Sequence, residues 1–264
     1  MANVCPIPSD SYKVGFIGAG KMAESIARGV VKSGILPASR IRTAHSGSAR
    51  RTAFESIGVT VFDNNTQVAE DSDVIIFSVK PQVVKNVVSQ LRPILSEKQL
   101  LVSVAAGVKL NDLQEWAGQD RFIRVMPNTP SAVGEAATVF TLAGKATAED
   151  GELISQLFGA IGKVWKADEK LFDAITGLRH VPSLMFLKLD LLSLNLMPIS
   201  APVLGAASMV SGMGKHPGQL KDDVASPGGT TIAGIHELEK SGFRGILMNA
   251  VVAAAKRSRE LSQN

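Results

Sequence analysis

Gly18-Ala19-Gly20-Lys21-Met22-Ala23 is the stretch of sequence that decides the fold, and it directly follows the β-branched and apolar run Lys13–Ile17. It has the form Gly-x-Gly-x-x-Ala, which is typical of a dinucleotide-binding turn between a first strand and a first helix. Gly18 permits the tight turn. Gly20 lacks a Cβ, so backbone amides at the positive end of the helix can approach a pyrophosphate. The alternative is a tight turn that carries no ligand.

The chain beyond this turn alternates strand-like and helical patterns. In the first helical pattern, apolar residues from Ala23 to Val30 recur at the spacing of one buried stripe. The alternation as a whole indicates a parallel, doubly wound sheet. The predicted strands are Lys13–Ile17, Arg40–Ala44, Asp73–Val79, Gln99–Val104 and Phe122–Met126.

The strand pattern fades from about Asp168 onward, where the sequence predicts mainly helices. Ile246–Leu261 is predicted to be a helix with basic residues near its negative C-terminal end. We therefore expect an α/β fold in two parts. A Rossmann-like, doubly wound domain occupies residues 1–167, and a mainly helical domain occupies residues 168–264. A chain of 264 residues is long enough for both.

The composition limits the class of protein. The single cysteine, Cys5, excludes an intrachain disulfide and a cysteine cluster for metal, and it fits a reducing compartment. The four histidines lack metal-ligand spacing, and no Gly-x-Ser-x-Gly motif is present, so we expect neither a bound metal nor a hydrolase. The net charge of +4 is scattered, which favours anionic small ligands over nucleic acid. The lack of a long apolar run or a targeting pattern predicts a cytoplasmic protein outside the membrane.

The second predicted strand runs into Ala44-His45-Ser46-Gly47-Ser48-Ala49-Arg50-Arg51. An NAD-specific protein normally has an acidic residue at this point to bind the ribose hydroxyls, and none is present. Ser46, Arg50 and Arg51 instead predict a pocket for the 2′-phosphate of NADPH, because guanidinium groups bind phosphate through charge-assisted hydrogen bonds. The alternative is a solvated, basic start to a helix, and NADH remains a possible cofactor.

Further loops stand where ligands bind in such folds. Lys80 follows a central strand at its carboxyl end, although a lysine there is often an ordinary surface residue. Ala105-Ala106-Gly107 lets the backbone lie close to a ligand, and Met126–Pro130 is a rigid loop after a strand. Ser226–Thr231 precedes a predicted helix, where amides, an N-capping hydroxyl and the helix dipole suit a small carboxylate. A well-capped helix without a ligand is the alternative there.

Taken together, these motifs resemble those of plant pyrroline-5-carboxylate reductases, the NAD(P)H enzymes that form proline. The resemblance covers most of the chain, and its most specific part is the block from His216 to Thr231. It rests on Val14–Ala23, Ser78–Gln82, Val104–Gly107, Arg124–Pro130, Asp173–Leu178 and His216–Thr231.

The resemblance implies a Rossmann domain followed by a helical domain that pairs into dimers and larger homo-oligomers, with the active site at the dimer interface. It implies NADPH-dependent hydride transfer to the imine carbon of pyrroline-5-carboxylate. Thr231 is then a candidate partner for the ring nitrogen, and Lys80 is the second candidate catalytic residue. The implied cofactor-binding residues are Gly18, Gly20, Lys21 and Met22 at the pyrophosphate, Ser46 and Asn65 at the adenosine end, and Val79, Lys80 and Ala105 at the nicotinamide. The implied substrate-binding residues are Ser226, Gly229, Thr230 and Thr231.

One segment departs from the family pattern. After Thr176-Gly177-Leu178 the family continues with a Ser-Gly-Ser-Gly-Pro-Ala-Tyr loop, whereas this chain has a shorter, leucine-rich segment over 179–202. Leu187–Leu191 alternates like a strand where a helix belongs, a conflict that indicates a splice variant, a frameshift or a gene-model error. One alternative is therefore a cofactor-binding pseudoenzyme. The other is a β-hydroxyacid dehydrogenase, which should have a catalytic lysine on a helix after the first domain.

Overall fold

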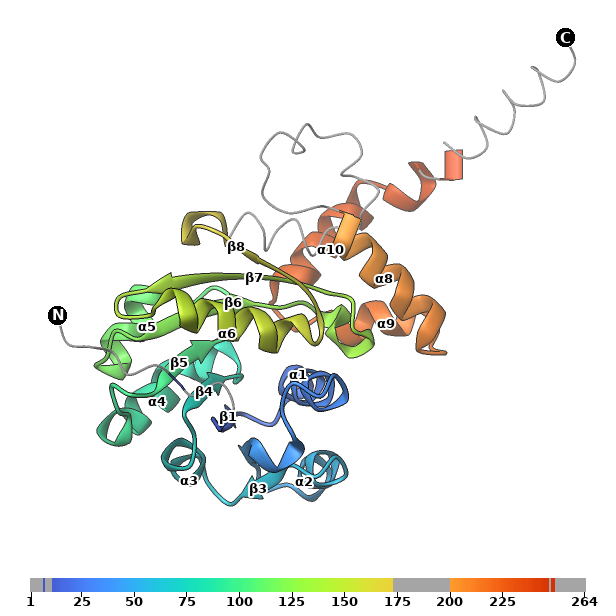
Figure 1. Ribbon diagram of the computed structural model, residues 1–264. Helices are drawn as coiled ribbons and strands as arrows, with labels where there is room; N and C mark the ends of the chain where they lie inside the picture. Colours follow the sequence, from blue (N-terminus) through green and yellow to red (C-terminus); the bar gives the residue numbers. More distant parts are fainter. Residues whose placement is uncertain (1–6, 8–10, 173–199, 247, 250–264) are drawn as a thin grey trace, which may run out of the picture.

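Eight strands form one sheet in the computed structural model, which describes residues 7, 11–172, 200–246 and 248–249 (Figure 1). The strand order is β3-β2-β1-β4-β5-β6-β7-β8. The strands are β1 Val14–Ile17, β2 Ile41–Ala44, β3 Thr60–Phe62, β4 Val74–Phe77, β5 Leu100–Ser103, β6 Phe122–Met126, β7 Ala136–Ala143 and β8 Gly162–Lys166.

Helices cover both faces of the sheet. One face packs against α1, α2 and α6, and the other against α3, α4 and α5. The central strands β1, β4 and β5 are buried along their whole length, as expected for a parallel sheet between two helical layers. These helices are α1 Lys21–Lys32, α2 Ser48–Glu55, α3 Asn65–Glu70, α4 Pro81–Leu91, α5 Leu110–Ala117 and α6 Ala148–Gly159, with 3-10 turns η1 Ala38–Arg40, η2 Arg92–Ile94, η3 Thr129–Val133 and η4 Glu169–Leu171.

The fold confirms the predicted α/β organisation in its central part. The five predicted strands correspond to β1, β2, β4, β5 and β6, and the neighbours from β3 through β6 pair in parallel. The predicted stripe on α1 is also present, since Ala23, Ile26, Ala27 and Val30 are all buried.

The far edge of the sheet differs from the sequence-based expectation. β3, β7 and β8 were not predicted, and β7 runs antiparallel to β6. The chain between these two strands holds only the turn η3, which is too short for the helical crossover that a parallel return requires. β8 then pairs in parallel with β7 and completes the sheet.

The helices α8 Ser200–Gly212, α9 Pro217–Val224 and α10 Thr230–Lys240 follow in the described part of the C-terminal region, and residues 243–246 and 248–249 are also helical (Figure 1). α8 packs against η3 and β7, and α9 lies beside α8. The predicted helix over 246–261 and the divergent segment over 179–202 lie almost wholly outside the described residues. The predicted domain boundary at 167/168 comes directly after β8 and stays a prediction.

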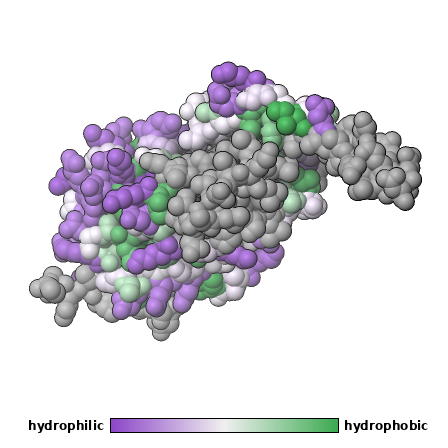
Figure 2. Space-filling view, turned by 90° about the horizontal axis from the view of Figure 1, so that it is seen from above, coloured by the Kyte–Doolittle hydropathy of each residue, from purple (hydrophilic) through white to green (hydrophobic). Residues whose placement is uncertain are grey.

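One face of the molecule is mainly polar where it is described (Figure 2). Figure 2 shows hydrophilic side chains over much of the coloured area, with smaller apolar areas between them. Of the five large apolar side chains that are exposed among the described residues, four belong to the C-terminal helices and the segment after them: Val210, Ile232, Ile246 and Met248. Among the described residues, no helix is both long and apolar enough to cross a membrane.

Candidate active site

The turn between β1 and α1 forms a cradle that leaves no room for a side chain at Gly18. Gly18 has a φ of 105°, and a Cβ added there would lie 2.7 Å from Cγ1 of Val79 and 3.0 Å from the carbonyl oxygen of Ser78. The Ser78 hydroxyl donates a hydrogen bond of 2.7 Å to the carbonyl of Gly18, which fixes the turn against the end of β4. The strand–turn–helix context that the motif predicts is therefore present.

The N-terminus of α1 is open toward a ligand. Gly20 is the N-cap residue, and no side chain hydrogen-bonds to the first-turn amides there. A Cβ at Gly20 would meet only the carbonyl oxygen of Ser78, at 3.9 Å, so the space beside these amides is free of neighbouring atoms. Free amides at the positive end of a helix fit the two phosphates of a dinucleotide.

The carboxyl ends of β1, β4 and β5 bring three predicted cofactor-binding positions to one edge of the sheet. Val79 follows β4 and contacts the glycine turn, and the exposed Lys80 is the N-cap residue of α4. Ala105, just beyond β5, is only 5% exposed. Ligands bind at such an edge in open α/β sheets, near the point where the strand order reverses.

The predicted adenosine end lies beyond β2. Ser46 is exposed in the loop before α2, and Asn65 is the first residue of α3.

The two arginines of α2 point to different neighbours. Arg50 donates to the carbonyl of Ala19 at 2.7 Å and to Glu24 at 2.8 Å. Arg51 is held instead at the end of β3, by Glu55 at 3.0 Å and Asp63 at 3.2 Å. Their role in binding the 2′-phosphate stays a prediction.

The start of α10 corrects one detail of the sequence analysis. A hydroxyl was expected to cap this helix, but the N-cap residue is Gly229, and no side chain hydrogen-bonds to the first-turn amides. The amide of Gly229 closes a turn onto the carbonyl of Ser226 at 2.9 Å, with Gly228 at a φ of 67°. The side chain of Thr231 is almost buried, whereas Thr230 and Ser226 are exposed. The first-turn amides are thus left for a carboxylate.

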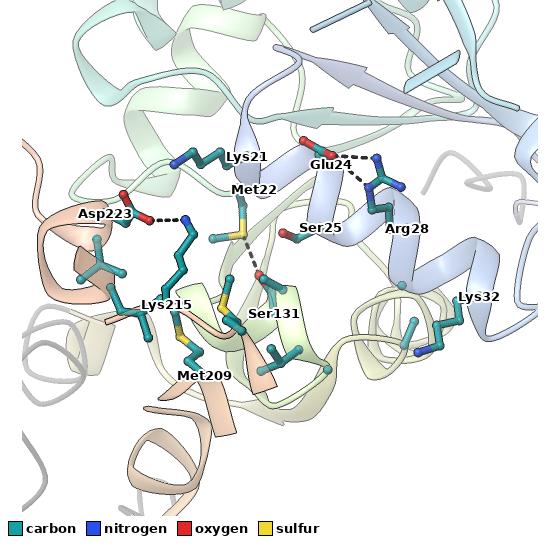
Figure 3. A pocket seen from close by; sticks show the side chains of 18 of the residues that line it. Lys21, Met22, Glu24, Ser25, Arg28, Lys32, Ser131, Met209, Lys215 and Asp223 are labelled. Carbon is teal, nitrogen blue, oxygen red and sulfur yellow. Dashed lines mark hydrogen bonds and ion pairs between the residues drawn. The ribbon is translucent and has the colours of Figure 1, made fainter. Parts of the chain in front are cut away.

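A cavity of about 810 Å³ separates α1 from α8, α9 and η3 (Figure 3). Lys21 and Met22 of the glycine turn line it, together with Met209 of α8 and Asp223 of α9. The Ser131 hydroxyl in η3 lies 3.7 Å from the sulfur of Met22. The cavity therefore joins the cofactor turn to the C-terminal helices. Lys80, Ala105 and the Ser226–Thr231 loop do not line it.

Several residues that line this cavity were missed by the sequence analysis. Lys215 and Asp223 lie at the two ends of α9, next to or within the motif that begins at His216, but a pattern of residue types does not reveal which of them form ion pairs. Glu24 was also missed. Burial opposes its ionisation, but hydrogen bonds from Arg28 and Arg50 outweigh this effect and hold the pKa of the Glu24 carboxyl below its ordinary value.

Within the described ranges, no group of three or more His, Cys, Asp and Glu residues is arranged to hold a metal ion.

A glycine cradle at the carboxyl edge of a doubly wound sheet defines the class of NAD(P)-binding oxidoreductases. Residues 13–107 match the family model described as NADP oxidoreductase, coenzyme F420-dependent. Residues 198–261 match the model described as pyrroline-5-carboxylate reductase dimerisation. The first match covers β1 to β5 with the helices between them, and the second covers the C-terminal helices.

Whole-chain comparisons define the family. The chain is 66% identical to the pyrroline-5-carboxylate reductase of Glycine max, over 98% of this chain and 99% of the relative. A solved pyrroline-5-carboxylate reductase from Coxiella burnetii has a TM-score of 0.63 and 32% identity, covering 96% of this chain and 99% of that one. The pyrroline carboxylate reductase of Plasmodium falciparum, solved with NADP bound, has a TM-score of 0.61 and 27% identity, covering 95% and 98%.

This chain belongs to the pyrroline-5-carboxylate reductase family. The alignment with the Glycine max relative runs over 272 positions, more than the 264 residues of this chain, so that relative has residues that this chain lacks. The comparisons give no support to a pseudoenzyme or to a β-hydroxyacid dehydrogenase.

Proposed function

We propose that this chain reduces 1-pyrroline-5-carboxylate to L-proline with NADPH, through the two half-sites described above. Membership of the family over 98% of the chain supports the reaction, and the glycine cradle of β1 and α1 is the structural observation that carries it. The enzyme is an NAD(P)-dependent oxidoreductase, and its reaction is the last step of proline biosynthesis.

The cofactor half-site uses the edge of the sheet. The first-turn amides of α1, with Gly18, Gly20, Lys21 and Met22, bind the diphosphate. Val79, Lys80 and Ala105 surround the nicotinamide, and the buried position of Ala105 keeps that side of the ring away from water. When bound, the reduced nicotinamide supplies the hydride for the imine carbon.

The substrate half-site uses the start of α10. The amides that follow the Ser226–Gly229 turn bind the ring carboxylate at the positive end of the helix, together with the side chain of Thr230. The hydroxyl of the nearly buried Thr231 hydrogen-bonds to the ring nitrogen. A protonated cyclic imine is already electrophilic, so orientation and the exclusion of water provide most of the rate enhancement, and no strong general acid is required.

The preference for NADPH is assigned to the end of β2. Ser46, Arg50, Arg51 and Asn65 surround the adenosine end, and no acidic side chain stands in the loop 45–49 to repel a 2′-phosphate. Both arginines are already ion-paired with acidic side chains. Their contribution to NADPH binding is therefore the gain from contact with the 2′-phosphate less the loss from weakening these ion pairs.

The oligomeric assembly is inferred from the family match, and the cellular compartment is inferred from the cysteine content. The dimerisation match over 198–261 supports a homo-oligomer, and we propose that it is built from dimers in which the exposed apolar residues of the C-terminal helices are covered. A single cysteine fits a reducing compartment, which supports work in the cytoplasm.

Steady-state turnover by the purified chain tests this function. NADPH oxidation should depend on added pyrroline-5-carboxylate, and chromatography should find one equivalent of L-proline for each NADPH consumed. A 3-hydroxy acid with NADP⁺ serves as the competing substrate class. Oxidation that does not depend on the imine, or preferred turnover of the hydroxy acid, would contradict the proposal.

A further inference from the structure

Glu169, the first residue of the turn η4 after β8, contacts two other elements of the sheet domain. Its Oε1 atom accepts a hydrogen bond of 2.8 Å from the amide of Leu110, the first residue of α5. The same oxygen accepts a hydrogen bond of 2.9 Å from Arg124 in the middle of β6. This carboxylate therefore joins the start of α5 and strand β6 to the chain that leaves the sheet after β8.

Arg124 is held from two sides by the segment after β8. Its side chain is only 3% exposed, and a buried guanidinium is costly unless an anion compensates its charge. Glu169 supplies the anion, and the guanidinium carbon lies 4.7 Å from the centre of the Phe172 ring, within the range of a cation–π contact. Phe172 is itself fully buried, in an apolar cluster with Met126 and Val139. The start of the connection to the C-terminal region is thus fixed by packing and by charge.

The contacts of this segment follow β6 toward the edge of the sheet where the nicotinamide half-site lies. Glu169 contacts Arg124, and Phe172 packs against Met126, which is two residues farther along β6 and ends that strand. The loop after β5 holds Ala105 and leads into α5, the helix whose first amide bonds to Glu169. The two loops beyond β5 and β6 are therefore connected through one carboxylate.

We propose that Glu169, through Arg124 and the amide of Leu110, is a positioning residue that sets the direction in which the chain leaves the nicotinamide edge for the dimerisation region. Residues 198–261, which match the dimerisation model, come after this point in the chain. The inference rests on the proposed function, because it takes the active site to lie at the dimer interface, as the resemblance implies. At such a site, the angle between the sheet and the dimerisation region decides how the substrate meets the nicotinamide.

Glu169→Gln separates the ion pair from the helix cap. The amide oxygen of glutamine still accepts a hydrogen bond from Leu110, but the negative charge opposite Arg124 is lost. A buried, unpaired guanidinium should lower the unfolding free energy. Arg124→Met in the same chain removes the cation as well, so the double variant should recover most of the lost stability. The ion pair that sets the direction of the chain is still absent, so activity should not recover.

The two readouts distinguish positioning from a purely structural role. Urea unfolding measures stability, and kcat/KM for pyrroline-5-carboxylate is referred to the concentration of NADPH-binding sites found by fluorescence titration. We expect this kcat/KM to fall by about tenfold in Glu169→Gln and to stay low in the double variant. The Kd of NADPH should stay within about twofold, because the glycine turn does not contact this ion pair. The oligomer mass in solution should not change.

Asp168→Asn is the matched control. Asp168 is the neighbouring carboxylate in the same turn, and it accepts a hydrogen bond of 3.0 Å from the amide of Lys170. It is exposed, and the side-chain oxygen of asparagine can accept the same bond. The change should therefore leave stability, kcat/KM and the Kd of NADPH unaltered.

The inference is overturned if Glu169→Gln lowers stability while kcat/KM for each NADPH-binding site keeps its unmodified value, or if kcat/KM recovers with stability in the double variant. Dissociation of the oligomer in Glu169→Gln would also overturn it, because assembly would then explain the loss. Failure of the proposed function gives a different result, since the unmodified chain itself would not turn over the imine. In that case additive effects of the two substitutions on stability would still refute the pairing of Arg124 with Glu169.

Discussion

A Cβ atom on Gly18 would lie 2.7 Å from Cγ1 of Val79, so the dinucleotide turn packs against the end of β4 with no space for a side chain. Gly18 also has a positive φ of 105°, a conformation that other residues adopt only with strain. At Gly20 the conditions differ, since a Cβ would have no neighbour closer than 3.9 Å. The two glycines of the motif are therefore required for different reasons.

We predict that Gly18→Ala lowers the free energy of unfolding by about 1–3 kcal/mol and abolishes NADPH binding, because the turn must change its shape. Gly20→Ala should leave the unfolding free energy nearly unchanged and still weaken NADPH, because the added methyl group stands where the diphosphate approaches. Thermal unfolding with and without NADPH measures both effects. Equal stability of the two variants would contradict the assignment.

The sequence predicts those features of the site that a local pattern of residues determines, and it does not predict those that depend on how distant elements pack. The spacing of Ala23, Ile26, Ala27 and Val30 was sufficient to predict the buried face of α1, and the glycines predicted the turn before it. The direction of Arg50 toward Ala19 was not predictable, because it depends on how α2 packs beside α1. The capping of α10 by Gly229 also depends on tertiary geometry, since three hydroxyl residues nearby were equally good candidates.

The double variant Arg50→Ala, Arg51→Ala should weaken NADPH more than NADH, by about 1–3 kcal/mol, because only NADPH carries the 2′-phosphate. Fluorescence titration with both cofactors gives the two losses. Arg28→Ala is the matched control, since Arg28 also pairs with Glu24 but projects from the exposed side of α1. If NADPH and NADH lose the same affinity in the double variant, the arginines do not belong to a 2′-phosphate pocket.

Thr231→Ala should lower kcat for pyrroline-5-carboxylate by about 10- to 100-fold, as expected for the loss of one hydrogen bond to the reacting ring. NADPH affinity should stay nearly intact, because Thr231 is in α10 and not in the glycine turn. Thr231→Ser keeps the hydroxyl and should retain much of the activity. Collapse of NADPH binding in the alanine variant, with unchanged turnover at saturation, would show that Thr231 belongs to the cofactor half-site.

Asp71 connects β1, β2 and the end of α3, and it provides a test of stability against pH. Burial opposes its ionisation, but the hydrogen bonds from Arg42, at 2.6 Å, and from Lys13 outweigh burial and lower the pKa of its carboxyl. A lowered pKa in the folded state stabilises the fold above the unfolded pKa, and this stability is lost as the pH falls through the folded value.

Asp71→Asn should therefore destabilise the chain by about 1 kcal/mol at neutral pH, a value reduced because the carboxylate is partly exposed. The difference from the unmodified chain should begin to shrink as the pH falls below about 4, where the unfolded carboxylate takes up its proton, and it should disappear at still lower pH, once the folded carboxylate is protonated as well. Urea unfolding at a series of pH values measures it. Glu97→Gln, which removes an exposed pair with Lys145, should show no such pH-dependent difference. A constant effect of Asp71→Asn at every pH would rule out the ion pairs as its cause.

Isotope transfer tests the central claim, direct hydride transfer between the two half-sites, most directly. The purified chain is supplied with pyrroline-5-carboxylate and NADPH deuterated on the transferred position of the nicotinamide C4, and the L-proline formed is analysed by mass spectrometry and NMR. The account predicts one deuterium in each proline, at the carbon that was the imine carbon of the ring. Proline without deuterium at that carbon, or deuterium released to solvent during turnover, would contradict it.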